Sequence, residues 1–204
     1  MPPRFIARQL ARPSGLLGRL VGRLMNRHNA KMNAFALQQL APAPTDRVLE
    51  IGFGGGVNLP TLIDAGAFVA GIDRSPDMVQ AARTRFAGAV TASRAAFCDG
   101  VIEAMPFDAA SFDKLCTCNT IYFWSSLDAG VTEIRRVLSA GGRVVIGLLP
   151  KERMERMSFP TDIFTACAAE DVAAALTRAG FADVGIARPE PSTPWCVVVA
   201  TAAR

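Results

Sequence analysis

The stretch Val48–Pro60, VLEIGFGGGVNLP, places four glycines within five residues, directly after a run of strand-forming residues. A glycine-rich turn between a strand and a helix lets the backbone approach a nucleotide closely. The turn does not fit the dinucleotide pattern G-x-G-x-x-G, because Val57 or Leu59 occupies the place of the last glycine in either frame. Glu50, two residues before the first glycine, would repel a pyrophosphate and attract an ammonium group. The loop therefore favours a nucleoside ligand that carries an amino group.

From residue 47 onward, short β-rich runs alternate with helical patterns, which is typical of βαβ units on a parallel sheet. The last two β-like runs follow each other without a helix and predict a closing hairpin, unlike the six-stranded dinucleotide fold. We expect strands at residues 47–52, 67–73, 93–98, 113–119, 142–149, 183–188 and 195–202. We expect helices at residues 57–66, 76–87, 127–139 and 168–179.

Two further acids come at or just after the ends of predicted strands, so that parallel strands would bring them to the same edge of the sheet as Glu50. Asp73 ends the second strand, where a carboxylate can accept hydrogen bonds from ribose hydroxyls. Asp99 follows the third strand and suits the amino group of an adenine, together with the backbone of Gly100 and Val101. An amino group, a ribose and an adenine together describe S-adenosylmethionine.

The sequence resembles the class I S-adenosylmethionine-dependent methyltransferases of the ubiquinone-biosynthesis type, over about residues 45–150 and more loosely over 165–204. The resemblance rests on VLEIGxGxG, on D-x-S-x-x-M from Asp73, and on MPFDAASFD and EIRRVLSAGG around the fourth strand and the third helix. It implies an α/β, Rossmann-like fold with a seven-stranded, mostly parallel sheet, a final antiparallel strand and helices on both faces. It also implies S-adenosyl-L-methionine as cofactor and S-adenosyl-L-homocysteine as product. The cofactor-binding residues that it implies are Glu50, Gly52, Gly54, Gly56, Asp73, Arg74, Met78, Asp99, Gly100, Val101 and Asn119.

The acceptor is less constrained, and candidates for the catalytic role are Asn119, Tyr122 and His28. The segment NTIYFWSS, residues 119–126, departs from the D/N-P-P-Y motif of methyltransferases that act on nucleic-acid bases. Apolar side chains after the fourth and fifth strands can line an acceptor pocket, or can instead pack as a small loop core. The acceptor-pocket candidates are Tyr122, Phe123, Trp124, Met154, Met157, Phe159 and Phe164.

These residues predict a methyltransferase that acts on a small, apolar or lipid-like acceptor by in-line transfer, with O-, N- and C-methylation all open. Two alternatives remain: a non-catalytic S-adenosylmethionine-binding module, and a phospholipid N-methyltransferase-like enzyme docked on a membrane. The sequence leaves the oligomeric state open.

Residues 1–45 form a predicted helical arm, separate from a cofactor-binding domain at 46–204. The arm carries seven basic residues and no acid, and the basic residues recur every four positions opposite an apolar face. It can act as a lid over the cofactor, as a peripheral membrane contact through residues 1–31, or as an organelle transit segment. Scarce aromatic residues in the arm and an acidic body disfavour nucleic-acid binding.

Five cysteines without a CxxC pair and a single histidine favour reduced core thiols and disfavour a metal site. No apolar run reaches the length of a membrane-spanning helix. The sequence therefore predicts a cytoplasmic protein, with peripheral membrane contact as an alternative.

Overall fold

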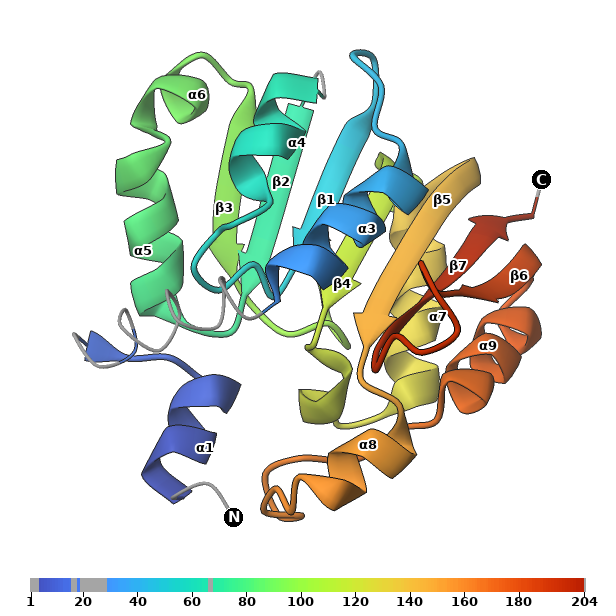
Figure 1. The fold of residues 1–204 in the computed structure, drawn as a ribbon. Coiled ribbons are helices and arrows are strands. Elements are labelled where there is room, and N and C mark those ends of the chain that lie inside the picture. The colour runs from blue at the N-terminus through green and yellow to red at the C-terminus, as the bar shows by residue number, and fades with distance from the viewer. Residues whose placement is uncertain (1–3, 16–17, 19–28, 66–67, 204) are drawn as a thin grey trace.

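The computed structural model describes residues 4–15, 18, 29–65 and 68–203, and its centre is a seven-stranded sheet (Figure 1). The strands are β1 Arg47–Ile51, β2 Phe68–Asp73, β3 Ala95–Asp99, β4 Phe112–Cys118, β5 Leu138–Leu148, β6 Phe181–Ala187 and β7 Cys196–Ala202. The helices are α1 Arg4–Ala11, α3 Ala30–Leu40, α4 Leu59–Ala65, α5 Pro76–Arg85, α6 Ala87–Thr91, α7 Leu127–Val137, α8 Lys151–Arg156 and α9 Ala169–Arg178, with a 3-10 turn η1 at Ile121–Phe123.

The strand order is β3-β2-β1-β4-β5-β7-β6, and the first five strands pair in parallel. Strand β7 runs antiparallel to both of its neighbours, β5 and β6. The expected mostly parallel sheet with a final antiparallel strand is confirmed. Because the chain order reverses between β1 and β4, a crevice is expected at their carboxyl ends.

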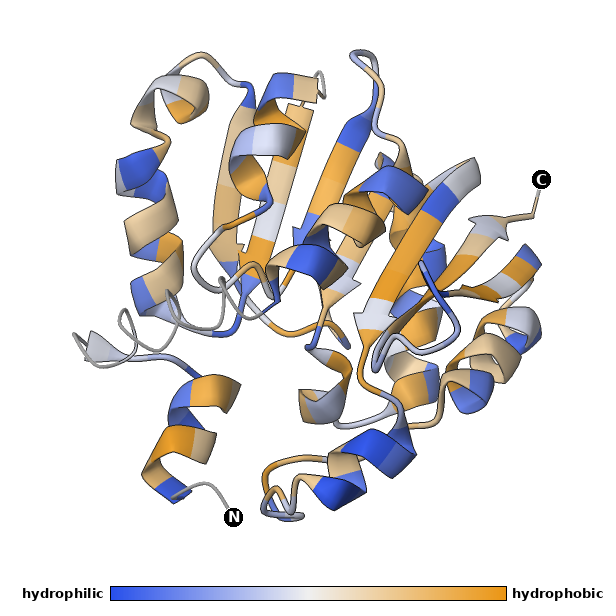
Figure 2. Ribbon diagram, in the orientation of Figure 1, coloured by the Kyte–Doolittle hydropathy of each residue, from blue (hydrophilic) through white to orange (hydrophobic). Residues whose placement is uncertain are grey.

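Helices cover both faces of the sheet, and successive residues of a strand supply the two faces in turn. In β1, Val48 packs with residues of α3, α4 and α5, whereas Leu49 packs with residues of α7 and α9. Both side chains are fully buried, as a strand covered on both faces requires. Figure 2 shows the apolar residues concentrated along the central strands.

The helix α5 begins as the sequence predicts. The Ser75 hydroxyl accepts a hydrogen bond from the Met78 backbone N–H, and Pro76 occupies the first turn. By contrast, α7 ends at Val137, two residues before the predicted end, because Leu138 already pairs with Phe112 in the sheet.

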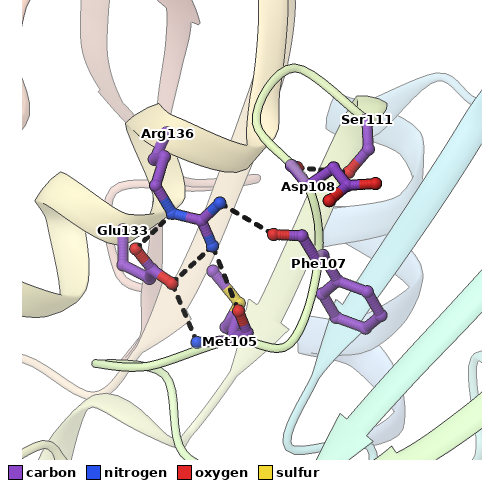
Figure 3. Close-up of polar contacts among 6 residues, drawn as sticks. All are labelled: Met105, Phe107, Asp108, Ser111, Glu133 and Arg136. Carbon is purple, nitrogen blue, oxygen red and sulfur yellow. Dashed lines mark hydrogen bonds and ion pairs between the residues drawn. The ribbon is translucent and has the colours of Figure 1, made fainter.

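A side-chain clamp joins α7 to the connection between β3 and β4 (Figure 3). The Arg136 guanidinium donates to both carboxylate oxygens of Glu133, at 2.6 and 2.7 Å. It also donates to the backbone oxygens of Phe107 and Met105, at 2.7 and 3.1 Å. Glu133 Oε1 in turn accepts from the Met105 N–H at 2.8 Å. The clamp satisfies backbone groups of a connection that has no strand partner of its own.

Helix α3 lies on one face of the sheet, against β4, β5 and β7, although the sequence assigns residues 30–40 to the arm. Its inward side chains Met32, Ala36 and Leu40 are buried. Within the described part of the chain, no helix has both the length and the apolar character needed to cross a bilayer.

Candidate active site

A cavity of about 520 Å³ opens at the carboxyl ends of the central strands, where the strand order predicts a crevice. Predicted cofactor residues at the ends of four strands, β1 to β4, line it together. These residues are Glu50, Gly52, Gly54, Asp73, Arg74, Gly100, Val101 and Asn119.

The glycine loop turns sharply at positions that only glycine fills without strain. Gly52 has a φ of +66°, and a Cβ at this position would lie 2.3 Å from Thr120 Cγ2 on the neighbouring loop. Gly54 has a φ of +49°, and a Cβ there would meet no atom within 4 Å. Gly52 therefore allows close packing of two loops, whereas Gly54 leaves open space toward the cavity.

Asp73 fixes the shape of the glycine loop from the end of β2. One carboxylate oxygen accepts from the Gly54 N–H at 2.7 Å, and the other accepts from the Ser75 N–H at 2.9 Å. Burial raises the pKa of Asp73, while these two hydrogen bonds and the nearby Arg74 oppose the rise. Each oxygen still has acceptor capacity for a further donor from the cavity.

Glu50 is buried at the end of β1 and has only one of its two oxygens satisfied. Its Oε1 accepts from Asn58 Nδ2 at 2.9 Å, and Asn58 also donates to Asn33 Oδ1 at 3.2 Å. Its Oε2 is buried and has no hydrogen-bond partner among the described residues. Burial, against the hydrogen bond from Asn58 and with a smaller contribution from the nearby Asp73, raises the pKa of Glu50 to about 7. A cationic donor from the cavity is what this carboxylate lacks.

Three predicted cofactor residues do not line the cavity. Met78 is buried in the core, and Gly56 turns the loop above Leu59. Asp99 pairs in register with Asp73 as the strand ends require, but its side chain is exposed outside the cavity lining. The role of Asp99 toward adenine stays a prediction.

One acid that the sequence did not predict also lines the cavity, Glu103. Its Oε1 accepts from the Ser125 N–H at 2.6 Å and from the Ser125 hydroxyl at 2.9 Å. Burial acts to raise the pKa of Glu103, but hydrogen bonds from Ser125, Ser126 and its own backbone bring it below the ordinary value. No local motif marks this residue, because its partner is 22 positions away in sequence.

All seven predicted acceptor-pocket residues line the same cavity as the glycine loop. The rings of Phe159 and Phe164 stack with centroids 4.6 Å apart, and Phe123 lies 4.8 Å from Phe164. The indole N–H of Trp124 donates to Thr120 Oγ1 at 3.2 Å, which leaves the ring face as an apolar surface.

Two of the three catalytic candidates meet at the end of β4. Asn119 has a φ of +59°, and its Oδ1 accepts from the Tyr122 hydroxyl at 3.1 Å. Burial raises the pKa of Tyr122, so its phenol stays protonated at neutral pH. The third candidate, His28, lies outside the described residues.

The helix α1 lies along one side of the cavity, in agreement with the lid among the roles that the sequence left open for the arm. Gln9, Leu10, Ala11 and Pro13 line the cavity, and Ala7 is fully buried. The Gly15 N–H donates to Asp77 at the start of α5, at 2.8 Å. Two more contacts hold α1 and the residues after it: an ion pair from Arg4 to Asp162 and a hydrogen bond from the Ser75 hydroxyl to the Pro13 oxygen.

Residues 49–146 match the family model described as a methyltransferase domain. The chain is similar to malonyl-[acyl-carrier protein] O-methyltransferase of Erwinia pyrifoliae, with 35% identity over 60% of this chain and 44% of the relative. It is also similar to the ubiquinone/menaquinone biosynthesis C-methyltransferase of a Geobacter species, with 28% identity over 64% of this chain and 56% of the relative. The aligned part thus spans about half the length of these two relatives.

Among solved structures, the fold is similar to a chain in the complex of the Haloferax volcanii Trm112 methyltransferase activator with a methyltransferase. The TM-score is 0.77 at 20% identity, over 98% of each chain, so the likeness concerns the fold. The methyltransferase-domain match begins at Leu49, directly before Glu50, and so contains the glycine loop and the end of β2. Together with the strand order and the cavity between β1 and β4, it shows that residues 49–146 form a methyltransferase domain of the class I S-adenosylmethionine-dependent type.

Proposed function

We propose that this protein transfers the methyl group of S-adenosylmethionine to a small, apolar or lipid-like acceptor. The observation that carries the proposal is the composition of the single cavity described above. One part of its lining is the glycine loop with Glu50 and Asp73, and another part is an aromatic and methionine cluster. A donor and an apolar acceptor could therefore share one enclosed space.

The cofactor side fits S-adenosylmethionine on three observations. The unpartnered Glu50 Oε2 suits the amino group, since it lacks a cationic donor. The open side of Gly54 leaves room for the ligand beside the loop. Asp73, held by two backbone N–H groups, has acceptor capacity left for the ribose hydroxyls. When bound, S-adenosylmethionine supplies an electrophilic methyl group on a sulfonium that departs as a neutral thioether.

The protein's own contribution would be alignment and exclusion of water rather than proton removal. Burial raises the pKa of Cys118 to about 12 and also raises that of Tyr122, so neither side chain is ionised at neutral pH. Glu103, with its lowered pKa, is a weak base. An acceptor that arrives already nucleophilic fits this lining best, because orientation alone can supply up to roughly 7–11 kcal/mol of the barrier reduction.

An apolar acceptor is supported by the seven aromatic and methionine side chains that line the cavity. One similar protein is named for ubiquinone and menaquinone biosynthesis and another for malonyl-[acyl-carrier protein], which is consistent with an acceptor that carries an apolar or acyl part.

We assign α1 the role of a lid. The ion pair from its Arg4 to Asp162, and the hydrogen bond from Gly15 after the helix to Asp77, support a position along the cavity. The membrane role of the arm stays a prediction, since most of its second basic repeat, residues 19–28, lies outside the described residues.

The test is a transfer assay with S-adenosylmethionine that carries a radiolabelled methyl group, against cell extract separated into lipids, small polar metabolites, protein and nucleic acid. We expect label in the lipid or apolar metabolite fraction, and much less of it with the Asp73→Ala variant at the same cofactor concentration. Binding of the cofactor without transfer to any fraction would favour a non-catalytic module. Label confined to nucleic acid or protein would refute the proposed acceptor class.

A further inference from the structure

The end of β4 and the end of β5 are joined through one phenol. Tyr122 Oη accepts a hydrogen bond from the Leu149 backbone N–H at 2.5 Å. The same hydroxyl lies 3.1 Å from Asn119 Oδ1 and 3.5 Å from the Leu149 carbonyl oxygen. Both Asn119 and Tyr122 line the cavity.

The direction of these hydrogen bonds can be worked out from the groups involved. A backbone N–H can only donate, so the Tyr122 oxygen must be the acceptor toward Leu149. The hydroxyl hydrogen of Tyr122 is then donated to Asn119 Oδ1, because the other acceptor, the Leu149 carbonyl oxygen at 3.5 Å, is beyond the usual range for an O–H donor. The oxygen end of the Asn119 amide is therefore fixed toward Tyr122.

The nitrogen end of the same amide is left for the cavity. Asn119 is half-buried, and among the described residues no group accepts a hydrogen bond from its Nδ2. The backbone of Asn119 is also held, since its N–H donates to the Gly147 oxygen at 2.8 Å and its φ of +59° suits asparagine better than most residues. The cavity thus contains an oriented amide N–H donor beside the aromatic cluster.

We propose that Asn119 recognises the acceptor by donating from Nδ2 to an anionic or carbonyl oxygen, and that Tyr122 is the positioning residue that turns the amide this way. The inference rests on the proposed methyl transfer and narrows its acceptor class. The acceptor is then an apolar molecule whose polar end is an oxygen such as a carboxylate, a phenolate or an enolate, and not an ammonium. An amine would place its own N–H groups against those of Asn119.

The described charges around the cavity predict a preference for cations, whereas the proposal predicts a preference for anions. This difference makes the proposal easy to test. Among the residues that the structure describes, three acids, Glu50, Asp73 and Glu103, line the cavity with one exposed arginine, Arg74. Simple attraction to this lining would favour a cation over an anion. A preference for an anion would therefore run against the described charges of the lining and would point to a specific donor.

The probes are octanoate and octylamine, which share an alkyl chain and differ in the charged end. Their binding is measured by calorimetry at neutral pH, with and without S-adenosylhomocysteine. We expect octanoate to bind roughly tenfold or more tightly than octylamine, since a hydrogen bond to a charged group is of that strength. If S-adenosylhomocysteine fails to bind, the proposed function is refuted. The ratio of the affinities for octanoate and octylamine still decides the present inference.

Three variants separate the donor from general packing. Asn119→Asp exchanges the donor for an acceptor but tolerates the same backbone conformation, and it should reverse the preference. Tyr122→Phe keeps the ring but frees the amide, and the preference should fall toward parity. Phe123→Leu is the matched control, which should weaken both probes and keep their ratio. Three results with the unmodified protein would overturn the inference: equal binding of the two probes, stronger binding of octylamine, or no binding of either. An unchanged ratio of the two affinities in Asn119→Asp would overturn it as well.

Discussion

Replacing Glu50 with glutamine should make the free protein more stable and a poorer cofactor binder. Glu50 is 5% exposed, and its Oε2 has no partner among the described residues. Glutamine keeps the size of the side chain and an oxygen for the hydrogen bond from Asn58, which is 2.9 Å long. It removes the buried negative charge, for which the described residues provide no cationic partner.

The size of the effect follows from the pKa of Glu50, which burial raises from 4.5 to about 7. The folded protein binds the proton of the Glu50 carboxyl group more tightly than the unfolded chain does. Below pH 4.5 the carboxyl group is protonated in both states, so Glu50 costs no stability there. The cost grows between pH 4.5 and 7 and is complete above pH 7. One pKa unit corresponds to about 1.4 kcal/mol, so the full cost is on the order of 3 kcal/mol. This is the most that Glu50→Gln can recover, because the new amide N–H groups also need partners.

The assay is urea unfolding without cofactor, on both sides of this pH range, beside calorimetry with S-adenosylhomocysteine. We expect the variant to gain stability over the unmodified protein above pH 7 and to lose that advantage below pH 4.5. Affinity of the unmodified protein for S-adenosylhomocysteine should fall as the pH drops below 7, since the free carboxylate must lose its proton to bind an ammonium. The variant should bind weakly and without this pH dependence. A variant that is less stable above pH 7, or that binds equally well, would refute the reasoning.

Three other substitutions test single contacts. Asp73→Ala should weaken S-adenosylhomocysteine binding roughly tenfold to hundredfold, because a charged acceptor for the ribose is lost; unchanged calorimetry would contradict its role. Arg136→Ala should lower the free energy of unfolding in urea by about 1–2 kcal/mol, since two backbone oxygens lose their donor; an unchanged midpoint would argue against the clamp. Gly52→Ala should destabilise the protein more than Gly54→Ala, as both have positive φ but only the former brings a Cβ within 2.3 Å of Thr120; equal unfolding midpoints would contradict this.

Much of the fold follows from local patterns. A parallel sheet covered on both faces needs continuous apolar strands, and these are easy to recognise in β1 and β4. The start of α5 is equally local, because Ser75 and Pro76 act on the helix that they begin. The end of α7 was predicted two residues too late, because pairing of Leu138 with a distant strand overrides the helical pattern.

Some residues of the site can likewise be predicted from local patterns, and others cannot. Glu50 and Asp73 follow from motif spacing, because each sits at the end of a strand and parallel strands end at one edge. Glu103 and the lining residues of α1 do not, because their partners are far away in sequence. Asp99 lies at the expected strand end, yet its side chain is exposed outside the cavity lining.

The sequence by itself determined the sheet, the glycine loop and the class of cofactor, because these depend on residues a few positions apart that act through the backbone. Only the tertiary structure decided which side chains share the cavity and how their hydrogen bonds run. The unpartnered oxygen of Glu50 and the orientation of the Asn119 amide are set by Asn58 and Tyr122 after the chain has folded. A hydrogen-bonding group gains a direction only when its neighbours are in place, and the proposed recognition of the acceptor depends on that direction.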